Sequence, residues 1–139
     1  MMLVLNTAWG RVSDSCQHAR EVEHLLPTKY FCRDECSRAL TYAERWANGD
    51  GYLVGLCALY DSTERARAAA YRALWLCGDP AKQAAVHAFL SACEAAVAAI
   101  KATDFAPIEA THMAIEAMAN ATKADEWTKV ALAYAAAES

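Results

Sequence analysis

Glycine and proline are scarce in this sequence, with five glycines and three prolines among 139 residues. Alanine instead supplies much of the 56% hydrophobic fraction, and alanine favours helices while contributing little to a pleated sheet. The chain is long enough to bury a core within one domain covering residues 1–139. We therefore predict a single all-α domain.

Arginine is missing from the second part of the chain, since every arginine lies between Arg11 and Arg72. From Asp79 onward, four lysines face eight acidic residues, so this part carries essentially all of the net charge of −4. A chain with this charge lacks the dense basic surface needed to wrap nucleic acid. We expect no direct contact with nucleic acid.

The sequence also lacks a recognisable targeting segment or membrane span. Its first ten residues, "MMLVLNTAWG", have no basic region before their short apolar run. The longest apolar stretch, Ala84 to Ile100, is interrupted by His87 and Glu94. These features predict a cytosolic protein.

Several helix starts can be read from capping residues. Asp79-Pro80 predicts a helix that runs to about Ala102, and Ala106-Pro107 predicts another, because proline suits the first helical position. Three further boundaries are predicted from capping residues, glycine and proline. A helix is predicted to begin at Ser13 or Asp14 and to end at Pro27. Another is predicted to begin at Asp61-Ser62-Thr63-Glu64 and to end at Gly78. The last helix is predicted to restart near Lys123, within Thr122–Asp125. Together they predict a bundle or array of six to seven mostly antiparallel helices.

The stretch "ERWANGDGYL", residues 44–53, resembles a ligand loop but has the features of a helix end. The apolar positions before it follow a 3.6-residue period that stops at Asn48-Gly49. A phosphate loop would precede a helix, and a calcium loop needs more oxygen ligands than Asp50 offers. We predict that Gly49 ends the helix in the left-handed conformation and that Gly51 tolerates substitution better.

The same region carries a family resemblance. Residues 24–53, "HLLPTKYFCRDECSRALTYAERWANGDGYL", and the later "ERARAAAYRALWLCGDPAKQAAVHAFLSACEAA" are similar to an alanine-rich helical immunity-protein-like family of bacteria and phages. The matching positions of its arginine–alanine–aromatic helix are Arg38, Ala39, Leu40, Ala43, Trp46, Ala47 and Gly49. The likeness covers roughly residues 16–100. It implies a helical protein that neutralises another protein, and it carries no catalytic motif.

Two Glu-x-x-His pairs, Glu21–His24 and Glu109–His112, raise the alternative of a di-iron-like metal protein. Such a site would also need lone carboxylates from other helices, for which Glu44, Glu64 and Glu94 are available. Both pairs, however, fall on polar stripes, whereas a metal site in a bundle points inward through the apolar face. We therefore interpret both pairs as solvated and expect no metal or cofactor.

The six cysteines mostly fall on apolar helical phases, as small buried hydrophobic residues do. We expect them to be reduced, so that reductant leaves the melting temperature nearly unchanged. A zinc site that combines Cys32 and Cys36 with Cys16 and His18 is a weaker alternative. No residue type around these thiols marks one of them as an activated nucleophile.

Helical phases also predict which residues face the core. The helix after Asp79 has one narrow polar stripe that includes His87, so we expect it to be the central helix. Tyr71 and Trp75 are predicted to be core residues, in preference to a base-stacking platform. On the helix after Pro107, the face predicted to be apolar holds Ile108, Ile115, Met118 and Ala119.

The acidic stripe of that last region is the predicted partner-binding surface. It comprises Glu109, His112 and Glu116, with Asp125 and Glu126 further along, in a part of the chain without arginine. Such acids would steer a partner with a basic surface, as nucleic-acid-handling enzymes have. The next candidates are the aromatic residues Trp9, Tyr30 and Phe31.

These observations favour a non-enzymatic inhibitor that binds a partner protein stoichiometrically. A toxin-immunity protein and a phage-encoded inhibitor of a host defence complex, such as an anti-CRISPR protein, fit the size and acidity equally well. The alternatives are the metal-dependent or ligand-binding helical protein and a homo-oligomeric scaffold.

Overall fold

A computed structural model describes residues 2–51, 55–75, 78–104 and 107–138 of the chain. Within these residues it contains five α-helices and two short 3-10 helices, and it has no strand. The α-helices are α1 (Met2–Arg20), α2 (Cys32–Ala47), α4 (Leu56–Trp75), α5 (Pro80–Asp104) and α6 (Pro107–Glu138). The 3-10 helices η1 (Glu23–Leu25) and η2 (Lys29–Phe31) join α1 to α2. The all-α prediction is confirmed, with fewer helices than the predicted six to seven.

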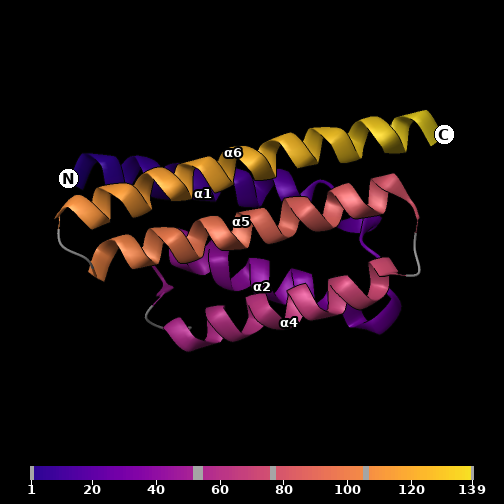
Figure 1. Ribbon diagram of the computed structural model, residues 1–139, viewed down its shortest axis with the longest axis horizontal. Helices are drawn as coiled ribbons and strands as arrows, with labels where there is room; N and C mark the ends of the chain where they lie inside the picture. Colours follow the sequence, from indigo (N-terminus) through magenta and orange to yellow (C-terminus); the bar gives the residue numbers. More distant parts are fainter. Residues whose placement is uncertain (1, 52–54, 76–77, 105–106, 139) are drawn as a thin grey trace.

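The helices form a bundle in which successive long helices run in opposite directions (Figure 1). Helix α5 is the central element, as predicted, because it contacts α1, α2, α4 and α6. Helices α6 and α4 lie on opposite sides of α5 (Figure 1). One hydrophobic cluster joins buried residues of all five helices.

The central position explains the high hydropathy of α5. By length and composition residues 80–103 could cross a membrane, with a mean hydropathy of 1.4, but 72% of that window is buried inside the bundle. A helix that is apolar over most of its circumference is expected at the centre of such a bundle. His87 lies in its remaining polar stripe and is exposed, as predicted, with its ring stacked on Trp127 of α6 at 4.7 Å.

The proline-marked helix starts are confirmed. Helix α5 begins at Pro80, and the carboxylate of Asp79 accepts a hydrogen bond of 2.9 Å from the backbone N–H of Ala81. This bond satisfies one of the four N–H groups that a helix start leaves without a partner. Helix α6 begins at Pro107, while the preceding Ala106 lies outside the described residues.

The end of α2 is also confirmed. Gly49 has a φ of 87°, and its N–H donates to the carbonyl of Trp46, while the N–H of Asp50 donates to the carbonyl of Arg45. These two bonds form a Schellman motif, in which a residue with positive φ closes the helix. The expectation for Gly51 is wrong, because a Cβ at this buried position would overlap the indole ring of Trp46.

Two predicted helix starts are wrong. Ser13 and Asp14 lie within α1, and the sequence Asp61–Glu64 lies within α4. The buried hydroxyl of Thr63 donates to the carbonyl of Leu59 one turn earlier, which satisfies it without a helix start. Helix α4 is described as far as Trp75, residues 76–77 lie outside the described residues, and Gly78 is outside the helix without adopting a positive φ.

Helix α6 does not restart near Lys123 but runs unbroken over 32 residues. The polar residues that suggested a restart bind α1 instead. Thr122 accepts a hydrogen bond of 2.9 Å from Arg11, and Asp125 forms an ion pair with Arg11 and a hydrogen bond with His18.

The buried face of α6 also differs from the prediction. Ile108 and Ile115, which were predicted to face inward, are exposed. The residues that pack inward are small: Ala110, Ala114, Ala117, Ala121, Ala124, Thr128 and Ala131. Ala119 is also exposed, whereas Met118 is partly buried against the core. Alanine side chains let the backbones of α5 and α6 approach closely, so the small face is the one that packs.

Candidate functional site

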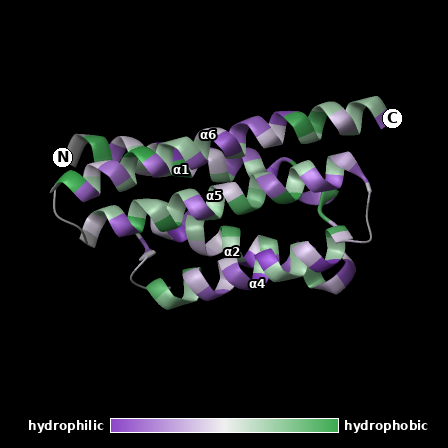
Figure 2. Cartoon of the chain, viewed as in Figure 1, coloured by the Kyte–Doolittle hydropathy of each residue, from purple (hydrophilic) through white to green (hydrophobic). Residues whose placement is uncertain are grey.

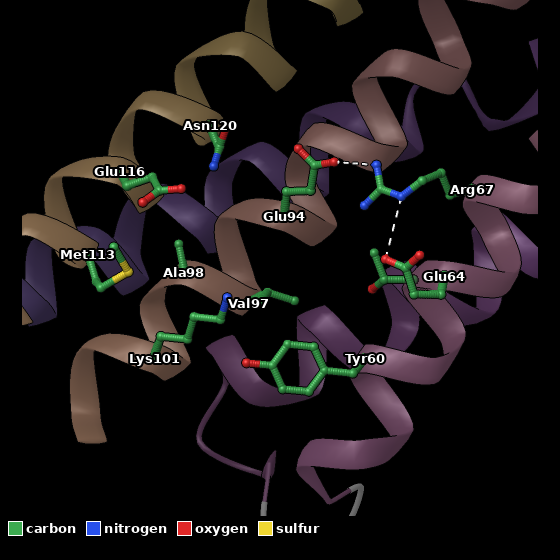
Figure 3. A pocket seen from close by; sticks show the side chains of 11 residues that line it. Tyr60, Glu64, Arg67, Glu94, Val97, Ala98, Lys101, Met113, Glu116 and Asn120 are labelled. Atoms are coloured by element: carbon green, nitrogen blue, oxygen red, sulfur yellow. Dashed lines mark hydrogen bonds and ion pairs between the residues drawn. The ribbon is translucent and has the colours of Figure 1, made fainter. Parts of the chain in front are cut away.

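A polar groove of about 450 Å³ lies between α4, α5 and α6 (Figure 3). Arg67 bridges two of its walls, with one ion pair of 2.7 Å to Glu94 and one of 3.5 Å to Glu64. The hydrogen bond to Glu94 raises the pKa of Arg67. Lys101 lies over the ring of Tyr60, with its Nζ atom 5.9 Å from the ring centroid. The charges of this groove therefore largely compensate one another.

The carboxylates considered for a metal site are held by arginines. Glu44 binds Arg20, and Glu64 and Glu94 bind Arg67. Glu21 and His24 follow α1 and are exposed, and Glu109 and His112 are exposed on α6. Across the part of the chain that the structure describes, no three His, Cys, Asp or Glu side chains are grouped to hold an ion. This geometry gives the metal-dependent alternative no support.

Four thiols are buried in the core, on α1, α2 and α5: Cys16, Cys32, Cys36 and Cys93. Burial raises the pKa of Cys93 to about 12 and raises that of Cys16 still further. Cys32 and Cys36 lie one turn apart with their sulfurs at 4.0 Å. The fifth described cysteine, Cys57, is exposed on α4, and Cys77 lies outside the described residues. Cys16 and Cys93 are therefore held protonated, act as small apolar residues and are poor nucleophiles.

The predicted acidic stripe is only partly an open surface. Glu109, His112, Glu116 and Glu126 are exposed on α6. Asp125 is not, because it lies 3.3 Å from a guanidinium nitrogen of Arg11 and 2.8 Å from Nδ1 of His18. Asp125 is therefore paired with an arginine, although its own part of the chain contains none. The sequence could not show that α1 would place Arg11 beside α6.

A second surface is formed by four aromatic residues of η2 and α4, Tyr30, Phe31, Tyr71 and Trp75, which we call the aromatic surface. Phe31, Tyr71 and Trp75 are 72%, 67% and 74% exposed. The rings of Tyr71 and Trp75 have centroids 5.8 Å apart and are tilted by 40°. The prediction that Tyr71 and Trp75 belong to the core is wrong, because small residues such as Ala66, Ala70 and Ala73 form the buried face of α4.

The backbone at Tyr30 and Phe31 is unusual. Both residues have positive φ angles, 56° and 59°, which is costly for residues with a Cβ atom. Phe31 is also the N-cap of α2 and supplies no capping side chain. Strained backbone of this kind is concentrated at binding and catalytic sites, where the surrounding structure holds it in place.

Arg33 holds this strained turn. Its guanidinium donates hydrogen bonds to the carbonyls of His24 and Leu26, and its backbone N–H donates to the carbonyl of Pro27. These bonds tie the start of α2 to the end of η1, so the two aromatic residues between them are forced outward. No sequence pattern predicts such a turn, since aromatic residues rarely adopt a left-handed backbone conformation.

A hollow of about 350 Å³ lies within the aromatic surface, lined by Tyr30, Tyr71, Arg72 and Trp75. Arg72 and the neighbouring Lys29 are exposed, and within the described residues neither forms an ion pair. The hollow therefore offers aromatic faces together with the guanidinium of Arg72 as a cationic hydrogen-bond donor. Of the other predicted aromatic candidates, Trp9 is only partly exposed and packs against the core.

Comparisons with protein-family models, with curated proteins and with solved structures found no match to this chain.

Proposed function

We propose that this protein binds a partner protein stoichiometrically and inhibits it, with the aromatic surface as the contact. The proposal depends mainly on one observation: Tyr30, Tyr71 and Trp75, which are 50%, 67% and 74% exposed, line one hollow together. Exposed apolar patches with a cavity are typical of interaction sites, and tyrosine and tryptophan are enriched among the residues that dominate binding energy.

The strained turn supports the same proposal. Holding Tyr30 and Phe31 in left-handed backbone costs stability, and their side chains contribute little to the core because they are exposed. A turn of this kind is expected where the exposed aromatic rings contact a partner. A rigid, preorganised aromatic anchor also loses little conformational entropy on binding.

The partner contact is placed at the aromatic surface in preference to the acidic stripe, because Asp125 is already paired within the protein. The acidic residues Glu109, Glu116 and Glu126 still contribute to the net charge of −4. That net charge favours a partner whose surface outside the contact is basic, and it would raise the rate at which the two proteins associate. A cytosolic immunity protein or a phage-encoded inhibitor remains the class of inhibitor that we propose.

The proposal is tested by removing the two rings on α4. A tagged Tyr71→Ala/Trp75→Ala variant and the wild-type protein are each used to capture proteins from host lysate, and captured proteins are quantified by mass spectrometry. An Arg65→Ala variant serves as the matched control, because Arg65 is an exposed residue of the same helix. We expect a partner retained by the wild type and the control to be lost with the double variant. Equal capture by all three proteins would show that the aromatic surface is not the contact.

A further inference from the structure

The outward side of α6 is an exposed face whose N-terminal part is apolar. Ile108 is 82% exposed and Ile115 is 55% exposed, and both lie opposite the buried alanines of the same helix. Ala119 and Glu126 continue this line along α6 and are exposed as well. We call this line of Ile108, Ile115, Ala119 and Glu126 the α6 outer face. Figure 2 shows hydrophobic stretches near both ends of α6.

Beside this face, a negative charge lies in the N-terminal half of α6 and a positive charge follows it further along the helix. Glu116 lies in the N-terminal half and Lys123 lies two turns later, so both are on the same flank of the face. Both are exposed, and within the described ranges neither forms an ion pair. They are seven positions apart, so they lie about 10 Å apart along the helix axis, too far for contact with each other.

We propose that two copies of this protein associate through their α6 outer faces, with the two helices antiparallel and a twofold axis near Ala119. In such an arrangement residue i of one copy faces residue j of the other, and j faces i in turn. With the axis between Ala119 and Asn120, Glu116 of each copy lies opposite Lys123 of the second copy. The twofold axis places the flank that carries Glu116 and Lys123 next to the same flank of the second copy, so two equivalent ion pairs form. The small side chain of Ala119 at the axis permits close approach.

An apolar hollow at one end of the face is consistent with this occupant. It measures about 360 Å³ and is lined by Ile108, Glu109, His112 and Met113. In the antiparallel arrangement this hollow faces the segment around Val130 of the second copy. The apolar hollow of each copy is therefore covered by the second copy, while the charged pairs flank the centre.

The available area sets the strength of the association. A helix of 32 residues is about 48 Å long, and a strip about 10 Å wide on each copy buries roughly 1,000 Å² in total. This area is at the lower limit for specific interfaces, so we expect a reversible dimer with a dissociation constant in the range of about 10–100 µM.

The dimer does not depend on the proposed inhibitory function. Helix α4 lies on the far side of α5 from α6, so the aromatic surface of each copy stays exposed (Figure 1). Loss of the dimer and loss of partner capture can therefore be observed separately.

The test is a charge exchange followed by sedimentation velocity over a concentration series. Glu116→Lys alone and Lys123→Glu alone each place like charges opposite each other twice, and we expect each to weaken the dimer by about tenfold or more. The Glu116→Lys/Lys123→Glu double variant restores opposite charges at both positions and should dimerise like the wild type. Arg65→Glu on α4 is the control for an equal change of charge elsewhere, and it should leave the dimer intact.

Two results would overturn the proposal. The first is a wild-type protein that remains monomeric well above the expected dissociation constant, which would leave the face to solvent or to another protein. The second is a double variant that is as weak as the two single variants, which would place the contact elsewhere. Circular dichroism of each variant verifies that the helices are intact.

Discussion

Arg20 of α1 binds both carboxylate oxygens of Glu44 of α2, with its Nη2 2.6 Å from Oε1 and its Nε 3.3 Å from Oε2. The same guanidinium also binds Glu23, Ser37 and Thr41, and all of these side chains are at most partly exposed. A bidentate arginine–carboxylate pair is directional as well as strong, so this network fixes how α1 packs on α2.

Loss of this arginine should destabilise the fold. We expect Arg20→Met to lower the free energy of unfolding by about 2 kcal/mol, because Glu44 would keep its charge in a partly buried place without a partner. The measurement is urea denaturation near neutral pH. Arg67→Met is the control, since Arg67 is more exposed and its loss should cost clearly less. Equal losses for both variants would contradict a structural role specific to Arg20.

Gly51 should be more sensitive to substitution than the sequence suggests. Gly49→Ala is expected to cost about 1 kcal/mol through its left-handed backbone, and Gly51→Ala about 1–3 kcal/mol through overlap with Trp46. A double-mutant cycle with Trp46→Ala separates the two causes. The cost of Gly51→Ala should fall sharply in the Trp46→Ala background, whereas the cost of Gly49→Ala should not. An unchanged cost at Gly51 would mean that Trp46 is not the obstacle.

The buried thiols predict a loss of stability in alkali. Burial raises the pKa of Cys93 from 9.0 to about 12, so the folded protein keeps a proton that the unfolded chain releases. The folded state then binds more protons than the unfolded state, and stability falls as the pH rises from 9 toward 12. Each such thiol adds a slope of up to about 1.4 kcal/mol per pH unit.

This effect can be measured by urea denaturation at a series of pH values above 8. Cys93→Ala should show a shallower alkaline slope than the wild type, whatever its stability at neutral pH. Cys57→Ala is the control, because Cys57 is exposed, and its slope should match that of the wild type. A wild-type slope in Cys93→Ala would exclude the thiol as the source.

The strained turn predicts that stability and partner binding change in opposite directions. Phe31→Asn should raise the free energy of unfolding by about 0.5–1 kcal/mol, because asparagine tolerates left-handed backbone better than phenylalanine. The same change removes an exposed ring and should reduce capture of the partner. Phe31→Ala is the comparison, because it removes the ring but keeps the backbone cost. If Phe31→Asn is no more stable than Phe31→Ala, the turn is not strained.

Part of the candidate site was visible in the sequence. Tyr30 and Phe31 were candidates as loop aromatics, but Tyr71 and Trp75 were assigned to the core because aromatic residues four positions apart usually mark a buried face. The structure buries alanines on α4 instead, and small residues give no contrast in a hydrophobic pattern when alanine occurs all around a helix.

The sequence by itself determined that the chain is helical, that α5 is central and begins at Pro80, and that α2 ends before Gly49. These features depend on local chemistry: helix propensity, a capping carboxylate, a proline and a residue without a Cβ atom. Only the tertiary structure decided which side of α4 and α6 faces inward, and that Arg11 pairs with Asp125. Helical phase relates residues of one helix to each other, but the inward face is chosen by which surfaces let neighbouring backbones approach.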